Sequence, residues 1–244
     1  MSAPNKYGLI GRNIGYSFSP TYFTQKFATL GIDATYENFD LPGLEHVEAI
    51  LGRQDVAGLN VTIPYKEQII PHLDELSPAA NAIGAVNTIA FKSGRRIGHN
   101  TDYIGFIESL QPFLDESPLS ALVLGDGGAS KAVAYALNSL EIPFKIVSRD
   151  KSGITYQELT PVFIAEHRLV INTTPLGTFP DVDAAPNLPY EGFTPSHIAF
   201  DLIYNPGETQ FMKRAASHGA NTLNGYNMLV KQAEAAWAIW QQSL

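Results

Sequence analysis

Cysteine is absent from this 244-residue sequence, and so is any long apolar run. Without cysteine the chain forms no disulfide and offers no thiolate to a metal, which fits a reducing compartment. No apolar segment approaches the roughly 20 residues that a membrane-spanning helix needs. Residues 1–7 also lack the basic start and apolar core of a signal peptide. We therefore expect a cytoplasmic protein with no membrane partner.

Basic charge is also scarce. The sequence has 16 Lys and Arg against 24 Asp and Glu, a net charge of −8, and no cluster of basic residues. A nucleic-acid-binding surface needs such a cluster, so we expect no nucleic-acid partner. The six histidines are scattered without the spacing of metal ligands, and we expect no metal site. With 45% hydrophobic and 16% charged residues, the chain has enough apolar side chains for one large or two modest globular domains.

Short apolar strand patterns alternate with helix patterns along the chain. In the first hundred residues the strands are expected at 7–11, 36–39, 58–63, 86–91 and 96–100, and the helices at 20–30 and 44–51. Further on, strands are expected at 121–124, 144–147, 169–172 and 198–202, with helices at 104–114, 131–140 and 228–240. Strands separated by helices predict an α/β protein whose second part is a parallel, doubly wound sheet.

A glycine-rich turn follows the apolar strand 121–124. The turn contains Gly125, Gly127 and Gly128, and an alanine-rich helix comes after it. Glycines let a backbone approach a pyrophosphate, and the N–H groups of a helix start attract it, so this segment predicts a dinucleotide site. A plain strand-to-helix turn is the alternative, because the sixth position of the fingerprint is Ser130. Asp126 is discordant, since a carboxylate that faced a pyrophosphate would repel it.

The end of the next strand carries Arg149 instead of the acidic residue that would bind a ribose 2′-hydroxyl. A guanidinium suits a 2′-phosphate and can stack on adenine, so the sequence favours NADP over NAD. The following Asp150 weakens this preference, and an ordinary solvated arginine is the alternative.

Polar residues gather at turns and strand ends in the first hundred residues. They are Ser17 and Ser19, Thr62 and Lys66, Asn87, and Asp102. Each also has a structural interpretation: Ser19 as the N-cap of a helix with Pro20 at its first position, Asp102 as the N-cap of the next helix, Asn87 as a turn residue and Lys66 as a surface lysine.

Several motifs occur together and in a fixed order: SFSP, NVTIPYK, GAVNT, NTD, GDGGAS, NTTPLG and NGYNMLVKQ. By these motifs the chain resembles the shikimate dehydrogenase family from about residue 8 to 240. The resemblance implies an N-terminal substrate domain, residues 1–102, completed by the C-terminal residues 225–244. It implies an inserted Rossmann-like NADP domain at residues 103–224, and the reversible NADPH-dependent reduction of 3-dehydroshikimate to shikimate.

The resemblance also implies roles for individual residues. Lys66 and Asp102 would form the catalytic pair, in which Lys66 stabilises and protonates the developing oxyanion. The substrate-binding residues would be Ser17 and Ser19 for the carboxylate, and Thr62, Asn87, Tyr204 and Gln232 around the ring. The cofactor would be held by Gly125, Gly127, Gly128, Ala129, Ser148, Arg149, Asn172, Thr173 and Gly225.

Three departures from the family pattern stand out. Tyr16 replaces a histidine, Asp126 replaces a small residue, and Ser148 stands where asparagine is common. Other interpretations stay open at this point: a quinate/shikimate dehydrogenase of broader specificity, a regulatory homologue that binds ligand without turnover, and a Rossmann protein without a ligand. The intact Lys66 and Asp102 pair argues against the regulatory homologue, and the polar residues clustered at strand ends argue against a Rossmann protein without a ligand. The oligomeric state, monomer or homodimer, is left open.

Overall fold

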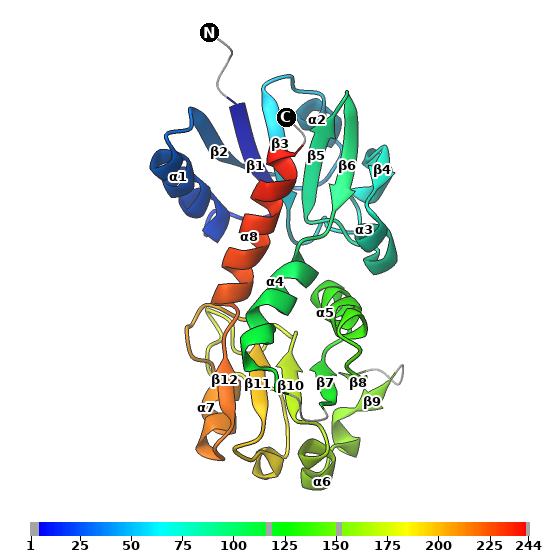
Figure 1. Ribbon diagram of the computed structural model, residues 1–244, viewed down its shortest axis with the longest axis vertical. Coiled ribbons are helices and arrows are strands. Elements are labelled where there is room, and N and C mark those ends of the chain that lie inside the picture. The colour runs from blue at the N-terminus through cyan, green and yellow to red at the C-terminus, as the bar shows by residue number, and fades with distance from the viewer. Residues whose placement is uncertain (1–4, 116–118, 150–152, 243–244) are drawn as a thin grey trace. The chain divides into compact units, whose positions relative to one another are not determined.

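The computed structural model describes residues 5–115, 119–149 and 153–242. The chain forms two compact units, each with its own six-stranded sheet (Figure 1). Unit 1 consists of Met1–Thr101 and Ala233–Leu244, and unit 2 of Asp102–Gln232. The expected α/β class is confirmed.

The sheet of unit 1 is mixed, with the strand order β2-β1-β3-β5-β6-β4. Its strands are β1 (Asn5–Gly11), β2 (Ala34–Asp40), β3 (Val56–Val61), β4 (Glu75–Leu76), β5 (Thr88–Lys92) and β6 (Arg95–His99). β1 runs parallel to β2 and β3, whereas β5 is antiparallel to β3 and to β6. The predicted hairpin between β5 and β6 is confirmed, and Ser93 and Gly94 both have the positive φ that such a tight turn requires.

Helices cover both faces of this sheet. They are α1 (Phe18–Leu30), α2 (Val47–Leu51), α3 (Pro78–Ile83) and the last part of α8 (Tyr226–Gln241). On one face, Phe23 and Phe27 of α1 and Trp240 of α8 pack around Tyr7. The opposite face packs against α2 and α3 through an aliphatic core that includes Leu59. The last part of α8 therefore belongs to the core of unit 1.

The sheet of unit 2 is entirely parallel, in the order β12-β11-β10-β7-β8-β9. Its strands are β7 (Ala121–Leu124), β8 (Phe144–Ser148), β9 (Ile154–Thr155), β10 (Leu169–Asn172), β11 (Ile198–Asp201) and β12 (Asn221–Leu223). The predicted doubly wound arrangement is therefore confirmed, and all six carboxyl ends lie along one edge. In open sheets of this kind, ligands bind at that edge.

The helices of unit 2 are α4 (Asp102–Leu110), α5 (Gly128–Ser139), α6 (Pro161–Ala165), α7 (Gln210–Ser217) and the first turns of α8. Alternate residues of β7 enter opposite cores: Ala121 and Val123 face α4 and α5, while Leu122 and Leu124 face α6 and α7. β7, β10 and β11 are buried on both sides along their whole length, which explains the unbroken apolar runs of the sequence at these strands.

The predicted domain limits differ from these units most at the second boundary. The prediction placed all of residues 225–244 in the first domain, whereas the structure divides α8 between Gln232 and Ala233. The reason is local packing, because Gly105 of α4 lies so close to α8 that a Cβ there would be 2.5 Å from the Met228 carbonyl oxygen. The first turns of α8 therefore belong to the core of unit 2.

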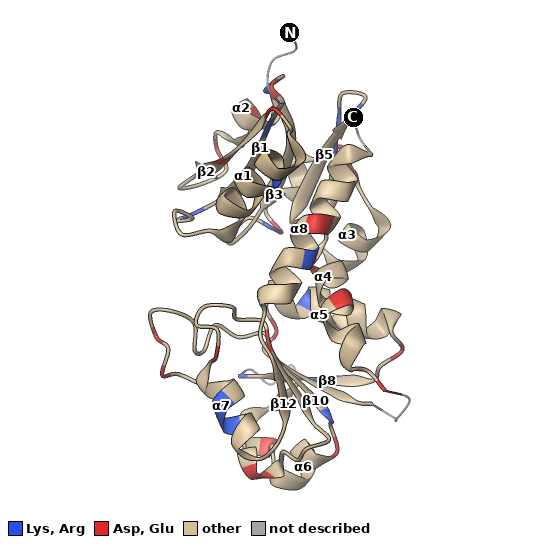
Figure 2. Ribbon diagram, turned by 60° about the vertical axis from the view of Figure 1, so that its left-hand side comes forward, with Lys and Arg blue, Asp and Glu red and all other residues tan. Residues whose placement is uncertain are grey.

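Charged residues are scattered along the elements of both units (Figure 2). Among the described residues, no helix is long and apolar enough to cross a membrane. Within the same ranges, no group of three or more His, Asp or Glu residues is placed to hold a metal ion.

Candidate active site

The two serines before and within α1 have different surroundings. Ser17 is the N-cap of α1 and its side chain makes no capping hydrogen bond. Ser19 is the second residue of the helix, 8% exposed, and hydrogen-bonds Tyr36 on β2. The structural interpretation of Ser19 as the N-cap with Pro20 at the first position is thus wrong, because the helix begins at Phe18.

A chain of buried polar side chains runs through unit 1 from Ser19. The Tyr36 hydroxyl donates to Asn60 Oδ1 at 2.8 Å, and Asn60 Nδ2 donates to the Asn87 carbonyl and to Thr88 Oγ1 at 3.2 Å. Burial raises the pKa of Tyr36, so its hydroxyl keeps its proton and donates. The link between Ser19 and Asn87 is thereby built from neutral groups.

Asn87 is the centre of the next links. Its Oδ1 accepts the Thr101 backbone N–H at 2.7 Å, and its Nδ2 donates to Thr101 Oγ1 at 2.9 Å. Asn60, Asn87, Thr88 and Thr101 are each at most 5% exposed. The amide of Asn87 therefore fixes Thr101, the residue immediately before Asp102, and Asp102 begins α4 instead of capping it.

Lys66 lies in the turn that follows β3. Its carbonyl oxygen accepts the Val86 N–H at 2.8 Å, next to Asn87, and the preceding Tyr65 is buried with its hydroxyl on the Leu41 carbonyl at 2.6 Å. Thr62 is held by a backbone hydrogen bond to Ile10 at 2.9 Å. The backbone that carries Thr62 and Lys66 is therefore anchored on both sides, and both side chains are half-buried.

The glycine turn of unit 2 has the geometry of an anion site. Gly125 has φ +104° and donates to the Val147 carbonyl at 2.8 Å, while Gly127 caps α5. A Cβ on Gly127 would meet nothing within 4 Å, so the backbone there is open to a ligand. Residues 126–129 are exposed. The start of α5 therefore offers free space and unpaired N–H groups of a helix terminus to a pyrophosphate.

The segment after β10 lies against this turn. Thr173 Oγ1 donates to the Leu124 carbonyl at 2.6 Å, and a Cβ on Gly125 would stand 2.9 Å from that hydroxyl. The Asn172 side chain is fully buried, and its Oδ1 accepts from the N–H and hydroxyl of Thr174 at 3.0 and 2.6 Å. Asn172 thus shapes the loop, and the loop fits only a glycine at position 125.

A buried carboxylate, which sequence reasoning missed, links the ends of β10 and β11. Asp201 accepts from Asn172 Nδ2 at 3.1 Å, from the Ile203 N–H at 3.0 Å and from Thr209 Oγ1 at 2.6 Å. Burial raises its pKa to about 6 against the lowering effect of these donors. Asp201 positions the loop that carries Tyr204, which is half-buried.

Two more predicted residues lie near the start of α8. Gly225 donates to the Ile203 carbonyl at 2.9 Å, and a Cβ on it would be 2.0 Å from the Leu202 carbonyl oxygen, so only glycine fits. Gln232 is 9% exposed and its Nε2 donates to the Leu229 carbonyl at 2.9 Å. Ser148 is the last residue of β8 and is 1% exposed, whereas Arg149 is exposed.

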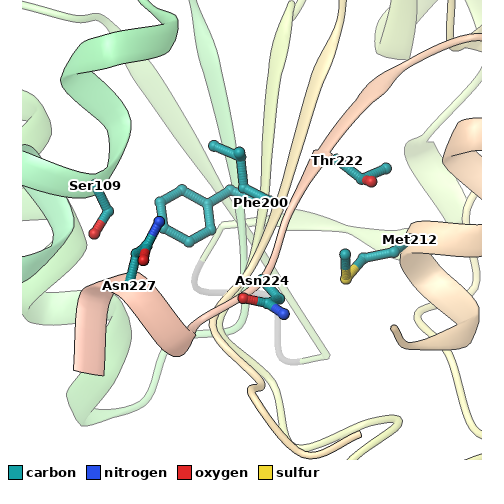
Figure 3. A pocket seen from close by; sticks show the side chains of 7 residues that line it. Ser109, Phe200, Met212, Thr222, Asn224 and Asn227 are labelled. Carbon is teal, nitrogen blue, oxygen red and sulfur yellow. The ribbon is translucent and has the colours of Figure 1, made fainter. Parts of the chain in front are cut away.

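A separate cavity of about 250 Å³ lies in unit 2 (Figure 3). It is lined by Ser109, Phe200, Met212, Thr222, Leu223, Asn224 and Asn227. None of the predicted catalytic, substrate-binding or cofactor-binding residues is among them, and none of its side chains carries charge. The cavity therefore lacks a group that could transfer a proton, and it is no candidate for the catalytic site.

Comparison with known proteins agrees with this arrangement. Residues 9–89 match the family model of the shikimate dehydrogenase substrate binding domain. The shikimate dehydrogenase (NADP(+)) of Desulforamulus reducens is 38% identical in an alignment 257 positions long, which covers 96% of this chain and 88% of that protein. The chain belongs to the shikimate dehydrogenase family.

Solved structures extend the family relation to the whole fold. The shikimate 5-dehydrogenase of Thermus thermophilus in complex with NADP(H) and shikimate has a TM-score of 0.85 and 35% identity, covering 98% of this chain and 94% of that one. The ligand-free 5-ketofructose reductase of Gluconobacter sp. strain CHM43 has a TM-score of 0.87 and 28% identity, covering 99% and 94%. The shikimate dehydrogenase fold thus also occurs in a reductase named for another substrate.

Proposed function

We propose that this member of the shikimate dehydrogenase family is an NADP-dependent shikimate dehydrogenase, which reduces 3-dehydroshikimate to shikimate and catalyses the reverse oxidation. The supporting observation is the buried chain Ser19–Tyr36–Asn60–Asn87, which gives unit 1 a fixed set of hydroxyl and amide groups. It lies in a sequence 96% of which aligns with an NADP-dependent shikimate dehydrogenase. Such groups suit a small polyhydroxylated acid.

The chain's own residues fit the dinucleotide. The open backbone at Gly127, with Gly128 and Ala129 in the first turn of α5, would hold the pyrophosphate, and Arg149 would hold the 2′-phosphate. Asn172, Thr173 and Gly225 would border the nicotinamide side. When bound, NADPH supplies the hydride.

Lys66 and Asp102 carry the proton chemistry in this proposal. As the carbonyl carbon of the substrate is reduced, negative charge builds on its oxygen, and the Lys66 ammonium stabilises and protonates that oxygen. Asp102 orients the ammonium and accepts a hydrogen bond from the resulting hydroxyl. Positioned acid catalysis of this kind contributes about 10²–10⁴-fold.

Substrate recognition is assigned to residues of unit 1 and to Tyr204 and Gln232 of unit 2. Ser17 donates to the substrate carboxylate, Ser19 donates to it by turning its hydroxyl from Tyr36 to the substrate, and the partial positive charge at the start of α1 supports both. Thr62, Asn87, Tyr204 and Gln232 contact the ring hydroxyls. Tyr36 joins this set as the residue that accepts the hydrogen bond of the Ser19 hydroxyl before the substrate binds.

Broader substrate use is the main alternative, since quinate differs from shikimate by an added ring hydroxyl, and the family fold also serves a 5-ketofructose reductase. The test is a steady-state assay of NADP⁺ reduction with shikimate and with quinate, beside NADPH oxidation with 5-ketofructose. We expect kcat/KM for shikimate to exceed the other two at least tenfold. Equal or higher values for either competitor would reassign the substrate, and binding without any turnover would indicate a regulatory protein. The cytoplasmic location and the monomeric or homodimeric state stay predictions.

A further inference from the structure

Three neighbouring parallel strands of unit 2 end at the same level. In their register Leu124 of β7 pairs with Val147 of β8, and Val147 pairs with Ile154 of β9. The residues two positions beyond these paired residues are Asp126, Arg149 and Tyr156. One acidic, one basic and one phenolic side chain therefore follow adjacent carboxyl ends of the sheet.

The charges of Asp126 and Arg149 both act on the hydroxyl of Tyr156. Burial raises the pKa of the half-buried Tyr156, the positive charge of Arg149 lowers it, and the negative charge of Asp126 raises it. The hydroxyl of Tyr156 therefore lies within the fields of the acid and of the base. Asp126 and Arg149 are both exposed.

The two opposite charges do not neutralise each other by contact. Within residues 5–115, 119–149 and 153–242, no ion pair joins Asp126 to Arg149. Asp126 also makes no hydrogen bond in those ranges that would draw its carboxylate away. A ligand that arrives at this edge meets both charges separately.

The adenosine ribose of a dinucleotide lies at the carboxyl end of the second strand of a doubly wound sheet, which here is β8. A 2′-phosphate brings close to two negative charges to that point, whereas a 2′-hydroxyl brings none. Arg149 attracts the phosphate, but Asp126 repels it and can accept a hydrogen bond from the hydroxyl.

Resting on the proposed function, we propose that Asp126 is a specificity-determining residue that weakens the preference of this site for NADP over NAD. The site thus combines one residue for each cofactor. Arg149 favours NADP by attracting its 2′-phosphate, and Asp126 favours NAD by repelling that phosphate. Across several ångströms of water-exposed surface, repulsion between one carboxylate and a phosphate dianion corresponds to roughly a five- to tenfold change in affinity.

Direct binding tests this independently of catalysis. The fluorescence of NADPH and of NADH is titrated with the wild type and with the Asp126→Asn, Asp126→Ala and Arg149→Ala variants. Both Asp126 variants should bind NADPH about five- to tenfold more tightly, with NADH affinity unchanged or weaker. The gain should shrink severalfold at high salt, because both charges are exposed. Arg149→Ala should change the ratio of the two affinities in the opposite direction.

Glu191→Gln is the matched control, since it removes one exposed negative charge from the segment Tyr190–Gly192, between β10 and β11. It should leave both affinities within about twofold. An NADPH-to-NADH ratio that stays within twofold in both Asp126 variants would overturn the inference, as would an equal gain in Glu191→Gln. The proposed function can fail without affecting this inference. Wild-type protein that binds the dinucleotides but oxidises no shikimate would leave the assignment of Asp126 intact. Wild type that binds neither dinucleotide would refute both.

Discussion

The proposed substrate site in unit 1 and the proposed adenosine site in unit 2 differ in how their polar groups are held. In unit 1 the polar groups Asn60, Asn87 and Thr101 are nearly fully buried and bond one another. In unit 2, Asp126 and Arg149 lie exposed beyond the strand ends. A buried amide that loses its partner costs about 1–3 kcal/mol, whereas exposed charges contribute little to stability. Substitutions in the first set should therefore affect folding and binding together, and those in the second should affect selectivity alone.

Replacement of Lys66, the proposed catalytic acid, should have the largest effect. Lys66→Ala should lower kcat by at least about a hundredfold, because the ammonium acts on charge that develops in the transition state. The dissociation constant of shikimate should stay within about tenfold. Single-turnover rates together with shikimate titrations would check this. A variant that retains more than a tenth of wild-type turnover would remove Lys66 from the role of acid.

The serine pair sharpens the contrast inside unit 1. Ser17→Ala and Ser19→Ala should each raise the KM for shikimate by roughly ten- to a hundredfold, because hydrogen bonds to a charged group contribute about 1.5–3 kcal/mol. Only Ser19→Ala should also lower the melting temperature, since Ser19 is buried and bonded to Tyr36 while Ser17 makes no capping bond. Normal shikimate KM values in both variants would refute the carboxylate assignment.

Asp201 is the buried exception within unit 2, and it predicts a pH effect on stability. Its pKa is about 6 in the folded protein and near 3.8 when unfolded, so the folded state binds more protons between pH 4 and 6. The stability of the protein should therefore fall as pH rises through this window, with a contribution on the order of 3 kcal/mol at about 1.4 kcal/mol per pKa unit.

The Asp201→Asn variant should lose that part of the pH dependence in denaturant unfolding followed from pH 4 to 7. Asp183→Asn, an exposed control in the same unit, should keep the wild-type slope. A slope that is unchanged in Asp201→Asn would place the titration elsewhere.

Arg149 should give the smallest of these effects. Arg149→Ala should raise the KM for NADP⁺ about tenfold, since one exposed charge-assisted contact to a phosphate is lost. The KM for NAD⁺ and the melting temperature should change little. If both cofactors weaken equally, the guanidinium stacks on adenine and another residue contacts the 2′-phosphate.

Much of the fold followed from local patterns. β7 and β10 have the predicted limits. Each is a run of four buried residues between turns, the pattern that is typical of a strand covered on both faces in a parallel sheet. α1 ends where Gly31 was expected to stop it, in a left-handed C-cap. In contrast, β4 and β9 have two residues each and β12 has three, which is too short for any periodicity, so they were not predicted.

Local patterns alone pointed to candidate site residues only where they follow a strand or begin a helix, whereas Tyr204 and Gln232 came from the resemblance to the family. Asn60 gave one further signal, an amide between the apolar residues Leu59 and Val61 of the expected strand 58–63. Its partner Tyr36 gave none, because a tyrosine in a strand is an ordinary core residue, and the bond between them spans 24 positions. Asp201 was equally hidden, since nothing local shows that Asn172 and Thr209 surround it.

The contrast between the two ends is tested most directly with Asn60→Ala. Unfolding free energy, the KM for shikimate and the KM for NADP⁺ would be measured on the same preparation. We predict a loss of about 2 kcal/mol or more in stability, since Tyr36 and Thr88 lose a buried partner. The KM for shikimate should rise severalfold and that for NADP⁺ should stay constant. A destabilised variant with an unchanged KM for shikimate would show that the buried chain serves folding alone and does not organise the substrate site.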